Sequence, residues 1–404
     1  MTALLCCCSL LLANVERVTV EIREPHGDRR HSDPVSGLLK LPRPVPAGTK
    51  FRLLRNGKPV LAQFRPSRPD GKCAEWWLDF MVGMAPHEVQ RYVVEYGADV
   101  EPGPELPHGH KLSEKPEAFV VANAPSIAWT VPRDLKGFLR SVTYPPPENL
   151  RPDSPGLVLR DRDGQVYPVG GAGTTARVIR QGPMAVELRF ERAETHEKLA
   201  GVRWTADLLF PVPVSWVEVT WSLRDPNRRV SGMGIQVRLK LKQPTASAPT
   251  IVDLGASRTV YTTLERDEQV ELRAAPFGVG KEPSDYSSYP WKVFRGLPDR
   301  LEPFVFAPLR SATEAEGWVQ VMDRKRCLAL AVGEFGKGEG CIHVSAAGTV
   351  SAWKTIATRP SGCATDARSF RAWLHFVEYP PQYGALSSPQ SMMHPIELRV
   401  VQTP

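Results

Sequence analysis

The stretch KEPSDYSSYPWKVFRG, residues 281–296, gathers aromatic and basic side chains in a segment without an apolar period. Its aromatic rings offer flat apolar faces to the C–H groups of a sugar, and their polar edges can hydrogen-bond hydroxyls. Its basic side chains can pair with a carboxylate, which arginine grips through two parallel hydrogen bonds. Because loops on a rigid scaffold commonly carry binding sites, we predict a ligand site here, with an aromatic plug that caps a core as the alternative. The predicted binding residues are Tyr286, Tyr289, Trp291, Lys292 and Arg295.

A second aromatic stretch, WLHFVEYPPQ at residues 373–382, contains Trp373 and His375. Its apolar residues also fit helical spacing, but its Pro-Pro pair stops a helix and its neighbours alternate as strands do. We therefore predict a strand on which Trp373 and His375 share a mixed aromatic face. Both residues join the predicted binding residues, and a hydrogen-bonded core histidine is the alternative for His375.

Elimination chemistry on a uronate can be assigned to three of these residues. The reaction needs a cation that neutralises the carboxylate and a base that removes the neighbouring C–H proton. Arg295 suits the first role, and Tyr289 or His375 suits the second, so these three are the candidate catalytic residues. No partner is predicted for His375, because the nearby carboxylate of Glu378 points to the other face of its strand.

The sequence predicts neither a metal site nor a cofactor. Four cysteines follow the N-terminal run: Cys73, Cys327, Cys341 and Cys363. They form no CxxC pair and have no histidine at metal-ligand spacing. The PHGH motif with His108 and His110 lies in a stretch rich in Pro, Gly and charge, where we expect a solvated linker. Neither a P-loop nor a GxSxG elbow is present.

An apparent hairpin joins Cys327 to Cys341, with its turn at GKG, residues 336–338. In that register the two cysteines are offset by about six residues, or about 20 Å along the strand. A disulfide needs Cα atoms within about 7 Å of each other. We therefore predict no disulfide between them.

Composition and charge indicate the class of protein. The 404 residues are 42% hydrophobic, and 39 prolines and 31 glycines are scattered between short apolar runs, as in all-β proteins. Lys and Arg exceed Asp and Glu by 51 to 44, a net charge of +7. Without a zinc-finger spacing, an RNA-binding motif or a basic helix, nucleic acid is not an expected partner. A diffuse positive surface suits an acidic ligand such as a uronate-containing glycan, and it equally suits solubility.

The chain begins with MTALLCCCSLLLANVERV, in which residues 3–13 form a short apolar run. This run lacks the usual basic start, but its length is that of a signal-peptide core. We predict a signal peptide over residues 1–17 and an extracytoplasmic location, periplasmic or secreted; a disordered tail is the alternative. No internal apolar run reaches the roughly 18 residues needed to cross a bilayer, so we predict no membrane span.

Alternation with period two dominates the rest of the chain. GIQVRLKLKQ, residues 234–243, is an example in which every second residue is apolar: Ile235, Val237, Leu239 and Leu241. This pattern predicts strands with one face in a core and one in water, and Asp163-Gly164 predicts a hairpin turn. Because paired amphipathic helices are missing from the pattern, Rossmann, TIM-barrel and helical-toroid folds are disfavoured.

The predicted fold is therefore all-β, with a small N-terminal β-barrel followed by a large two-sheet β-sandwich of the supersandwich type. A stretch rich in Pro, Gly and charge separates the two. The predicted domains are 18–100 for the barrel, 101–118 for the linker and 119–404 for the sandwich.

Two stretches resemble a known family. The first domain, with NGKPVLAQ at 56–63 and DGKCAEWWLDF at 70–80, resembles the N-terminal RIFT-barrel domain of exo-rhamnogalacturonan lyase-like proteins. WLHFVEYPPQYGALSSPQSMMHPIEL, residues 373–398, resembles the close of the galactose-mutarotase-type sandwich that follows in those proteins. The resemblance implies pectin-like glycans as ligands. In that family a long helical toroid after the β domains would be catalytic. No such helical segment is predicted in this chain. The resemblance therefore also implies a separate helical catalytic subunit as partner, in which case this chain alone would not be catalytic.

The sequence thus predicts an exported, carbohydrate-interacting β protein that binds an acidic or pectin-like polysaccharide without cleaving it. An active polysaccharide lyase or epimerase with a cleft in the sandwich is one alternative. A structural envelope protein without a sugar site is the other.

Overall fold

The computed structural model describes residues 15–68, 70–123, 127–143, 149–274, 289–307, 314–323, 326–356, 367–378, 392–394 and 396–401. The chain divides into two compact units: Met1–Pro107 with Ile396–Pro404, the first unit, and His108–Pro395, the second unit. Strands form nearly all the regular structure of the described residues, which confirms the predicted all-β class. Two short 3-10 turns, Glu197–Leu199 and Phe335–Lys337, interrupt them.

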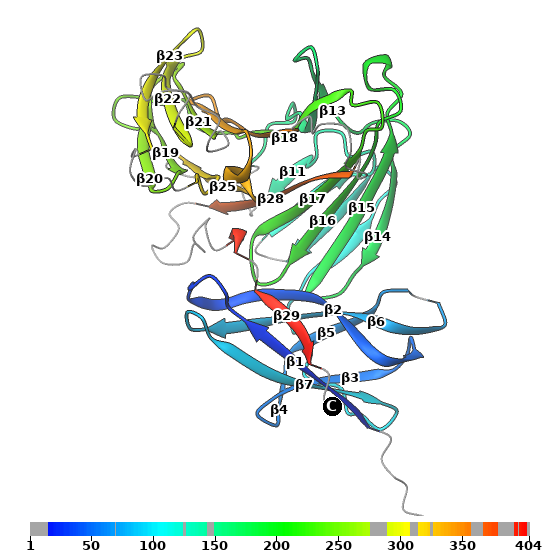
Figure 1. The fold of residues 1–404 in the computed structure, drawn as a ribbon. Helices are drawn as coiled ribbons and strands as arrows, with labels where there is room; N and C mark the ends of the chain where they lie inside the picture. The colour runs from blue at the N-terminus through cyan, green and yellow to red at the C-terminus, as the bar shows by residue number, and fades with distance from the viewer. Residues whose placement is uncertain are drawn as a thin grey trace, which may run out of the picture. The chain divides into compact units, whose positions relative to one another are not determined.

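The first unit packs two sheets around one core (Figure 1). The five-stranded sheet has the order β29 (Glu397–Val401), β1 (Glu16–Arg23), β7 (Val89–Gly97), β3 (Lys50–Arg55) and β4 (Lys58–Val60). The three-stranded sheet has the order β2 (Arg30–Pro46), β6 (Lys72–Met84) and β5 (Ala62–Pro66). Alternate residues of β1 face inward, and Val18, Val20 and Ile22 are buried because successive side chains of a strand point to opposite faces.

The last described strand, β29, completes the first sheet. It pairs antiparallel with β1, from Thr19 opposite Val401 to Arg23 opposite Glu397. The sequence analysis placed these residues in the second domain, whereas the structure assigns them to the first unit. Local alternation predicts that they form a strand, but it carries no information about a partner strand at the other end of the chain.

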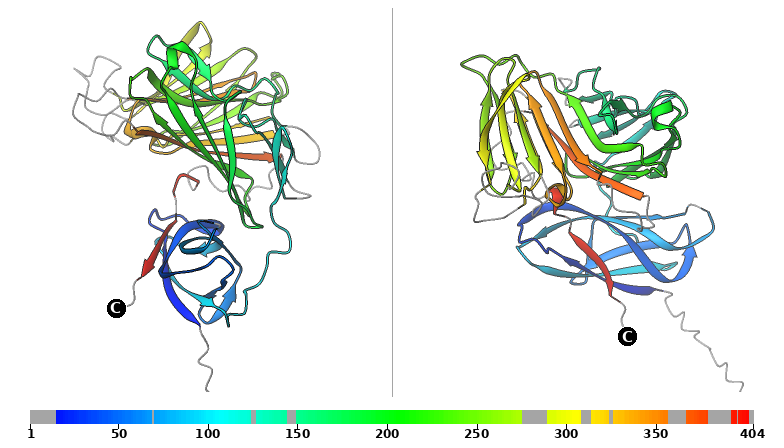
Figure 2. Two further views of the ribbon diagram at one scale, coloured as in Figure 1. Left: turned by 90° about the vertical axis from the view of Figure 1, so that its right-hand side faces the viewer. Right: turned by 45° about the horizontal axis from the view of Figure 1, so that its top comes forward.

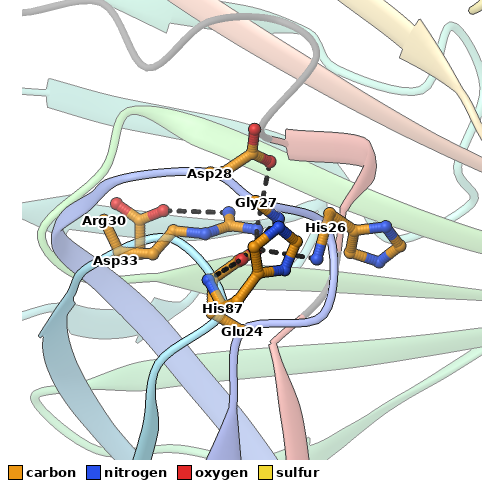
Figure 3. Close-up of polar contacts among 7 residues, drawn as sticks. All are labelled: Glu24, His26, Gly27, Asp28, Arg30, Asp33 and His87. Atoms are coloured by element: carbon orange, nitrogen blue, oxygen red, sulfur yellow. Dashed lines mark hydrogen bonds and ion pairs between the residues drawn. The ribbon is translucent and has the colours of Figure 1, made fainter.

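A buried carboxylate, Glu24, ties two loops of the first unit together (Figure 3). Glu24 is 0% exposed and accepts backbone N–H bonds from His26 at 3.2 Å, Gly27 at 2.6 Å and His87 at 3.1 Å. The Arg30 guanidinium donates a further bond at 3.1 Å. Burial opposes ionisation of Glu24, but these donors outweigh it and lower its pKa to about 2. Glu24 is therefore an ionised carboxylate whose hydrogen bonds hold the two loops together.

Arg30 is surrounded by carboxylates on the same side of the unit (Figure 3). Besides Glu24, it contacts Asp28 at 3.3 Å and Asp33 at 3.2 Å. Its side chain is buried, so these contacts compensate a charge that would otherwise be costly to remove from water.

Three sheets share one core in the second unit. The four-stranded sheet has the order β11 (Ser141–Thr143), β10 (Ile127–Pro132), β9 (Ala118–Asn123) and β8 (Lys111–Glu114). The eight-stranded sheet has the order β13 (Val166–Pro168), β12 (Gly156–Asp161), β18 (Val230–Arg238), β27 (Thr349–Thr355), β26 (Gly340–Ser345), β21 (Gln269–Ala274), β22 (Trp291–Leu297) and β23 (Arg300–Phe306). The nine-stranded sheet has the order β14 (Thr175–Arg180), β15 (Ala185–Ala193), β16 (Arg203–Pro211), β17 (Trp216–Arg224), β28 (Ala367–Glu378), β25 (Arg326–Val332), β24 (Trp318–Met322), β19 (Thr250–Gly255) and β20 (Thr259–Leu264). Figure 2 shows these strands from two further sides.

The apolar faces of all three sheets meet in this core. Residues that alternate along β18, such as Ile235 and Val237, are buried as the sequence predicts, and so are Leu239 and Leu241. The hairpin predicted at Asp163-Gly164 is confirmed, since β12 and β13 pair across it. The third, four-stranded sheet adds Phe119, Val121 and Trp129 to the core, a layer that the predicted two-sheet sandwich lacks.

The hairpin predicted between Cys327 and Cys341 is wrong. Cys327 belongs to β25 of the nine-stranded sheet and Cys341 to β26 of the eight-stranded sheet. The chain crosses between the sheets through the turn Phe335–Lys337. Both cysteines are free thiols.

The stretch predicted as a linker, 101–118, is divided between the units. The second unit begins at His108, and β8 already lies within this stretch. His110 is buried, its ring packs edge-on against Trp129, and burial lowers its pKa to about 4. The solvated linker expected around His110 is therefore wrong, because its ring fills apolar space.

Candidate functional site

The polar face of the eight-stranded sheet carries a hollow of about 380 Å³, a size within the range of ligand pockets, roughly 300–1,000 Å³. Side chains from β12, β21, β22, β26 and β27 line it, together with Tyr289, which precedes β22. Three of the lining side chains are cationic and three are aromatic: Arg160, Arg273 and Lys292, and Tyr289, Phe294 and Trp353. We call this site the basic hollow.

The strand register brings these residues together. Trp353 lies opposite Cys341, Cys341 opposite Arg273, and Arg273 opposite Lys292. These four residues therefore form one row across β27, β26, β21 and β22. Alternate residues of the same strands, such as Ile342, point into the core because a strand sends successive side chains to opposite faces.

Two glycines of β18 give one end of the basic hollow its shape. Gly232 lies opposite Arg160, and Gly234 lies opposite Trp353. A Cβ at Gly232 would lie 3.2 Å from the Arg160 guanidinium, and one at Gly234 would lie 2.8 Å from the Trp353 ring. The missing side chains thus let Arg160 and Trp353 lie close over β18. The guanidinium carbon of Arg160 is 5.7 Å from the Trp353 ring centroid, a cation–π distance.

Arg273 occupies the other end. Its Nε donates to Glu271 at 2.7 Å, and its guanidinium carbon lies 4.5 Å from the Phe294 ring centroid. Between the two ends lies Cys341, whose thiol has its pKa raised to about 12 by burial. The middle of the basic hollow is therefore uncharged at neutral pH.

Arg160 has no carboxylate partner in the part of the chain that the structure describes. Its polar contact there is a long bond of 3.4 Å from Nη2 to the Thr355 hydroxyl. The side chain is half-buried on the sheet, and its other guanidinium N–H groups have no acceptor among the described residues. An anionic group that enters the hollow would find donors already in position for charge-assisted hydrogen bonds.

The structure divides the residues predicted from 281–296 between two faces of the sheet. Tyr289 and Lys292 line the basic hollow. Trp291 and Arg295 point to the opposite side of β22, as alternation requires, and Tyr286 lies outside the described residues.

Neither Trp291 nor Arg295 contributes to the basic hollow. Trp291 is fully buried in the core, and its indole N–H donates to the Ser257 hydroxyl at 3.2 Å. It therefore has no free ring face for a ligand, contrary to the prediction. Arg295 donates to Glu268 at 2.8 Å and to Thr262 at 3.3 Å, and it lines a separate hollow of about 470 Å³ beside the β22–β23 turn.

Trp373 and His375 lie on β28, which confirms the predicted strand, but in the other large sheet. Both are buried in a cluster on the outer face of that sheet: Trp216, Trp318, Ala329, Ala331, Trp373 and Met392 form its apolar part. The Trp373 N–H donates to Glu218 at 3.1 Å. The His375 ring packs edge-on against Trp216 with centroids 5.9 Å apart, and burial lowers its pKa to about 4.

The candidate catalytic residues are therefore not assembled. His375 is 6% exposed, and its Nδ1 has no hydrogen-bond partner among the described residues. Tyr289 lines the basic hollow, Arg295 lines the other hollow, and His375 belongs to a different sheet. The arrangement supports the alternative of a buried core histidine for His375, although without the expected hydrogen bond at Nδ1.

Sequence reasoning missed most of the basic hollow. Arg160, Arg273, Phe294 and Trp353 lie on four different strands; Phe294 lies in the stretch 281–296 but was not among its predicted residues, and the other three belong to no local motif. One signal was available: SGMG, residues 231–234, places two glycines two positions apart in a strand. Glycine inside a strand often marks a close approach of another group.

The described residues show neither a metal site nor a helix that could span a membrane. Among them, no group of three or more His, Cys, Asp or Glu side chains is placed to hold a metal ion. Within the same residues, no helix is long and apolar enough to cross a membrane.

Comparisons with known proteins bear on the fold. No protein-family model matches the chain, and no curated protein matches it by sequence. An alpha-mannosidase from Enterococcus faecalis V583 is similar in structure, with a TM-score of 0.57 and 9% identity over 96% of this chain and 46% of that chain. A protein in the Glycosyl Hydrolase Family 38 from Enterococcus faecalis gives a TM-score of 0.54 and 10% identity over 96% of this chain and 47% of that chain. A galactose mutarotase-like protein from Lactobacillus casei ATCC 334 reaches only 0.34, with 12% identity over 67% of this chain and 100% of that chain.

The first two likenesses show that this all-β fold also occurs within carbohydrate-active enzymes. At such low identity they show the fold alone. The chain spans about half the length of these two structures.

Proposed function

We propose that this chain binds an acidic, pectin-like polysaccharide through the basic hollow and does not cleave it. One observation carries the proposal: three cations and three aromatic rings line a single hollow, and Arg160 has no carboxylate partner in the described part of the chain. A uronate offers both matching features, since its carboxylate can pair with a guanidinium and its ring face can pack on an aromatic side chain.

Two further observations support a carbohydrate ligand. The fold is shared with a glycoside hydrolase family protein and with an alpha-mannosidase. The first domain resembles that of exo-rhamnogalacturonan lyase-like proteins, which supports a pectin-like ligand in particular.

The test compares binding of polygalacturonate to the wild-type chain and to Arg160→Met, which keeps an unbranched apolar stem and removes the guanidinium with its charge. We expect the Kd to rise about tenfold, the equivalent of about 1.4 kcal/mol. Arg177→Met is the matched control, because Arg177 is 59% exposed and pairs with Glu191 on the nine-stranded sheet; its Kd should equal that of the wild type. Equal affinities of Arg160→Met and Arg177→Met would place the site elsewhere.

The same samples test the enzymatic alternative. A lyase releases unsaturated uronate, which absorbs in the near ultraviolet, and we expect no such release from a pectin panel. The separation of His375, Tyr289 and Arg295 favours this outcome. Release that disappears in Arg160→Met would instead make the basic hollow a lyase site, and the absence of any glycan binding would favour a structural envelope protein.

The proposal includes export and a partner. The apolar run at 3–13 supports a signal peptide, and N-terminal sequencing of protein recovered outside the cytoplasm tests it by locating a cleavage near residue 17. The resemblance supports a separate helical catalytic subunit. Co-purification of pectin-cleaving activity with the tagged chain from its native host tests that partner.

A further inference from the structure

We propose that the basic hollow binds an oligosaccharide segment with at least two acidic groups, held at two separate cationic positions, rather than a single acidic sugar. This inference rests on the proposed function and specifies its ligand. Two groups of contacts at opposite ends of the hollow define the two positions.

The first position is the guanidinium of Arg160. It lies over Gly232 of β18 and reaches the Thr355 hydroxyl of β27 at 3.4 Å. The Trp353 ring flanks it at 5.7 Å, which holds the charge at the β27 side of the hollow. Glu339 is exposed where it lines the hollow, and in the described part of the chain it forms no ion pair with Arg160.

The second position is the pair of cross-strand neighbours Arg273 and Lys292. Arg273 packs over the Phe294 ring of β22 at 4.5 Å, so its charge leans away from β27. Glu271 neutralises part of this position through its bond to Arg273. Lys292 adds a second cation beside it.

The strand order separates the two positions along the hollow. The strands β27 and β21 to β22, against which the two groups pack, lie two to three strand spacings apart, or about 10–14 Å between backbones at about 4.8 Å per spacing. One carboxylate bound by two parallel hydrogen bonds occupies a single guanidinium. Both positions are therefore filled only by two acidic groups on a longer ligand.

The floor between the two positions suits the sugar ring that would join those groups. It carries the neutral thiol of Cys341, and the rings of Trp353 and Phe294 flank it. An uncharged middle with aromatic sides accepts the apolar face of a sugar without requiring a further charge.

The experiment measures Kd by calorimetry for galacturonic acid and its dimer, trimer and tetramer, with the wild-type chain, Arg160→Met, Lys292→Met and the Arg177→Met control. We expect the wild-type Kd to fall at least tenfold from the monomer to the tetramer. Arg160→Met and Lys292→Met should each weaken tetramer binding and flatten this dependence on length, whereas Arg177→Met should not. Lys292→Gln replaces Lys292→Met if thermal unfolding shows that the methionine variant is not folded.

The outcomes separate this inference from the function on which it rests. Equal affinity for monomer and tetramer would overturn the two-position inference and leave acidic-glycan binding intact. Loss of tetramer binding in one variant with no change in the other would also overturn it, because a single position would then suffice. Absence of binding at every length would refute the proposed function itself.

Discussion

Two arginines, one in each unit, have opposite surroundings. Arg30 of the first unit is 4% exposed and contacts Glu24, Asp28 and Asp33 within 3.3 Å. Arg160 of the second unit is half-buried, and no carboxylate pairs with it among the described residues.

The difference teaches what defines a binding cation in a protein with many of them. A buried guanidinium that is paired with carboxylates contributes to the fold, because breaking such a pair leaves an uncompensated charge. A guanidinium that lies beside an aromatic ring and keeps its donors open is available to a ligand. The composition, with 51 basic residues, cannot distinguish the two cases.

The largest expected effect concerns Glu24. Glu24→Gln removes the charge that faces Arg30 and three backbone N–H groups. We expect the free energy of unfolding of the first unit to fall by about 3–5 kcal/mol, the range for breaking a buried ion pair, without a change in glycan binding. Urea denaturation measures it, and Glu397→Gln, in an exposed pair with Arg399, is the control. A loss no larger than that of the control would remove the distinction between the two arginines.

Acid should weaken the same contacts by protonating Glu24. The pKa of Glu24 is lowered from 4.5 to about 2, so its contribution is complete above pH 4.5 and is lost as the pH falls toward 2. We expect a loss of about 3 kcal/mol over that window, absent in Glu24→Gln. Hydrogen exchange of the β1 and β7 amides measures this loss in the first unit alone. It thereby separates the effect of Glu24 from that of His110 and His375 in the second unit, whose pKa values are about 4. An identical acid profile in both proteins would contradict the assignment.

A smaller effect is expected where the basic hollow depends on a missing side chain. In Gly234→Ala the new Cβ would lie 2.5 Å from the Ala352 carbonyl oxygen and 2.8 Å from the Trp353 ring. We expect the second unit to lose about 1–3 kcal/mol through overpacking and tetragalacturonate binding to weaken several-fold as Trp353 shifts. Thermal unfolding and calorimetry measure the two effects. Gly338→Ala, with nothing within 4 Å of the new Cβ, should change neither.

The smallest expected effect is a difference in salt dependence between ligand binding at the basic hollow and the stability of the first unit. Raising NaCl from about 0.05 M to about 0.5 M shortens the Debye length well below 10 Å and screens exposed charges. Binding at the basic hollow, which is open to water, should weaken several-fold, while the buried contacts of Arg30 should keep the stability of the first unit nearly constant. Titrations at both salt concentrations measure this, and salt-independent binding would argue against a charged ligand.

The sequence predicts which residues share one face of a strand better than it predicts which strands lie side by side. Alternation correctly places Ile235 and Val237 in the core and makes a strand of the segment with His375, and the Asp163-Gly164 turn signal locates a hairpin. It cannot indicate which strands lie side by side, since that depends on register between distant segments. The RIFT-barrel topology implied by the resemblance stays a prediction.

The candidate site illustrates the same limit. Arg160 and Thr355 are 195 residues apart in the chain yet share a hydrogen bond. The sequence predicts Lys292 and Tyr289 because they lie in a stretch rich in aromatic and basic side chains, and both line the basic hollow. Trp291 and Arg295 have the same local marks but face the other way, because the phase of β22 is fixed by its pairing with β21.

The pairing of β29 with β1 gives the first unit an unusual order of assembly. A ribosome exposes β1 early, but the strand that covers its edge emerges only after the second unit has been synthesised. Until then β1 presents an open edge to other chains. Nascent or prematurely truncated chains should therefore be the forms of this protein most in need of a chaperone.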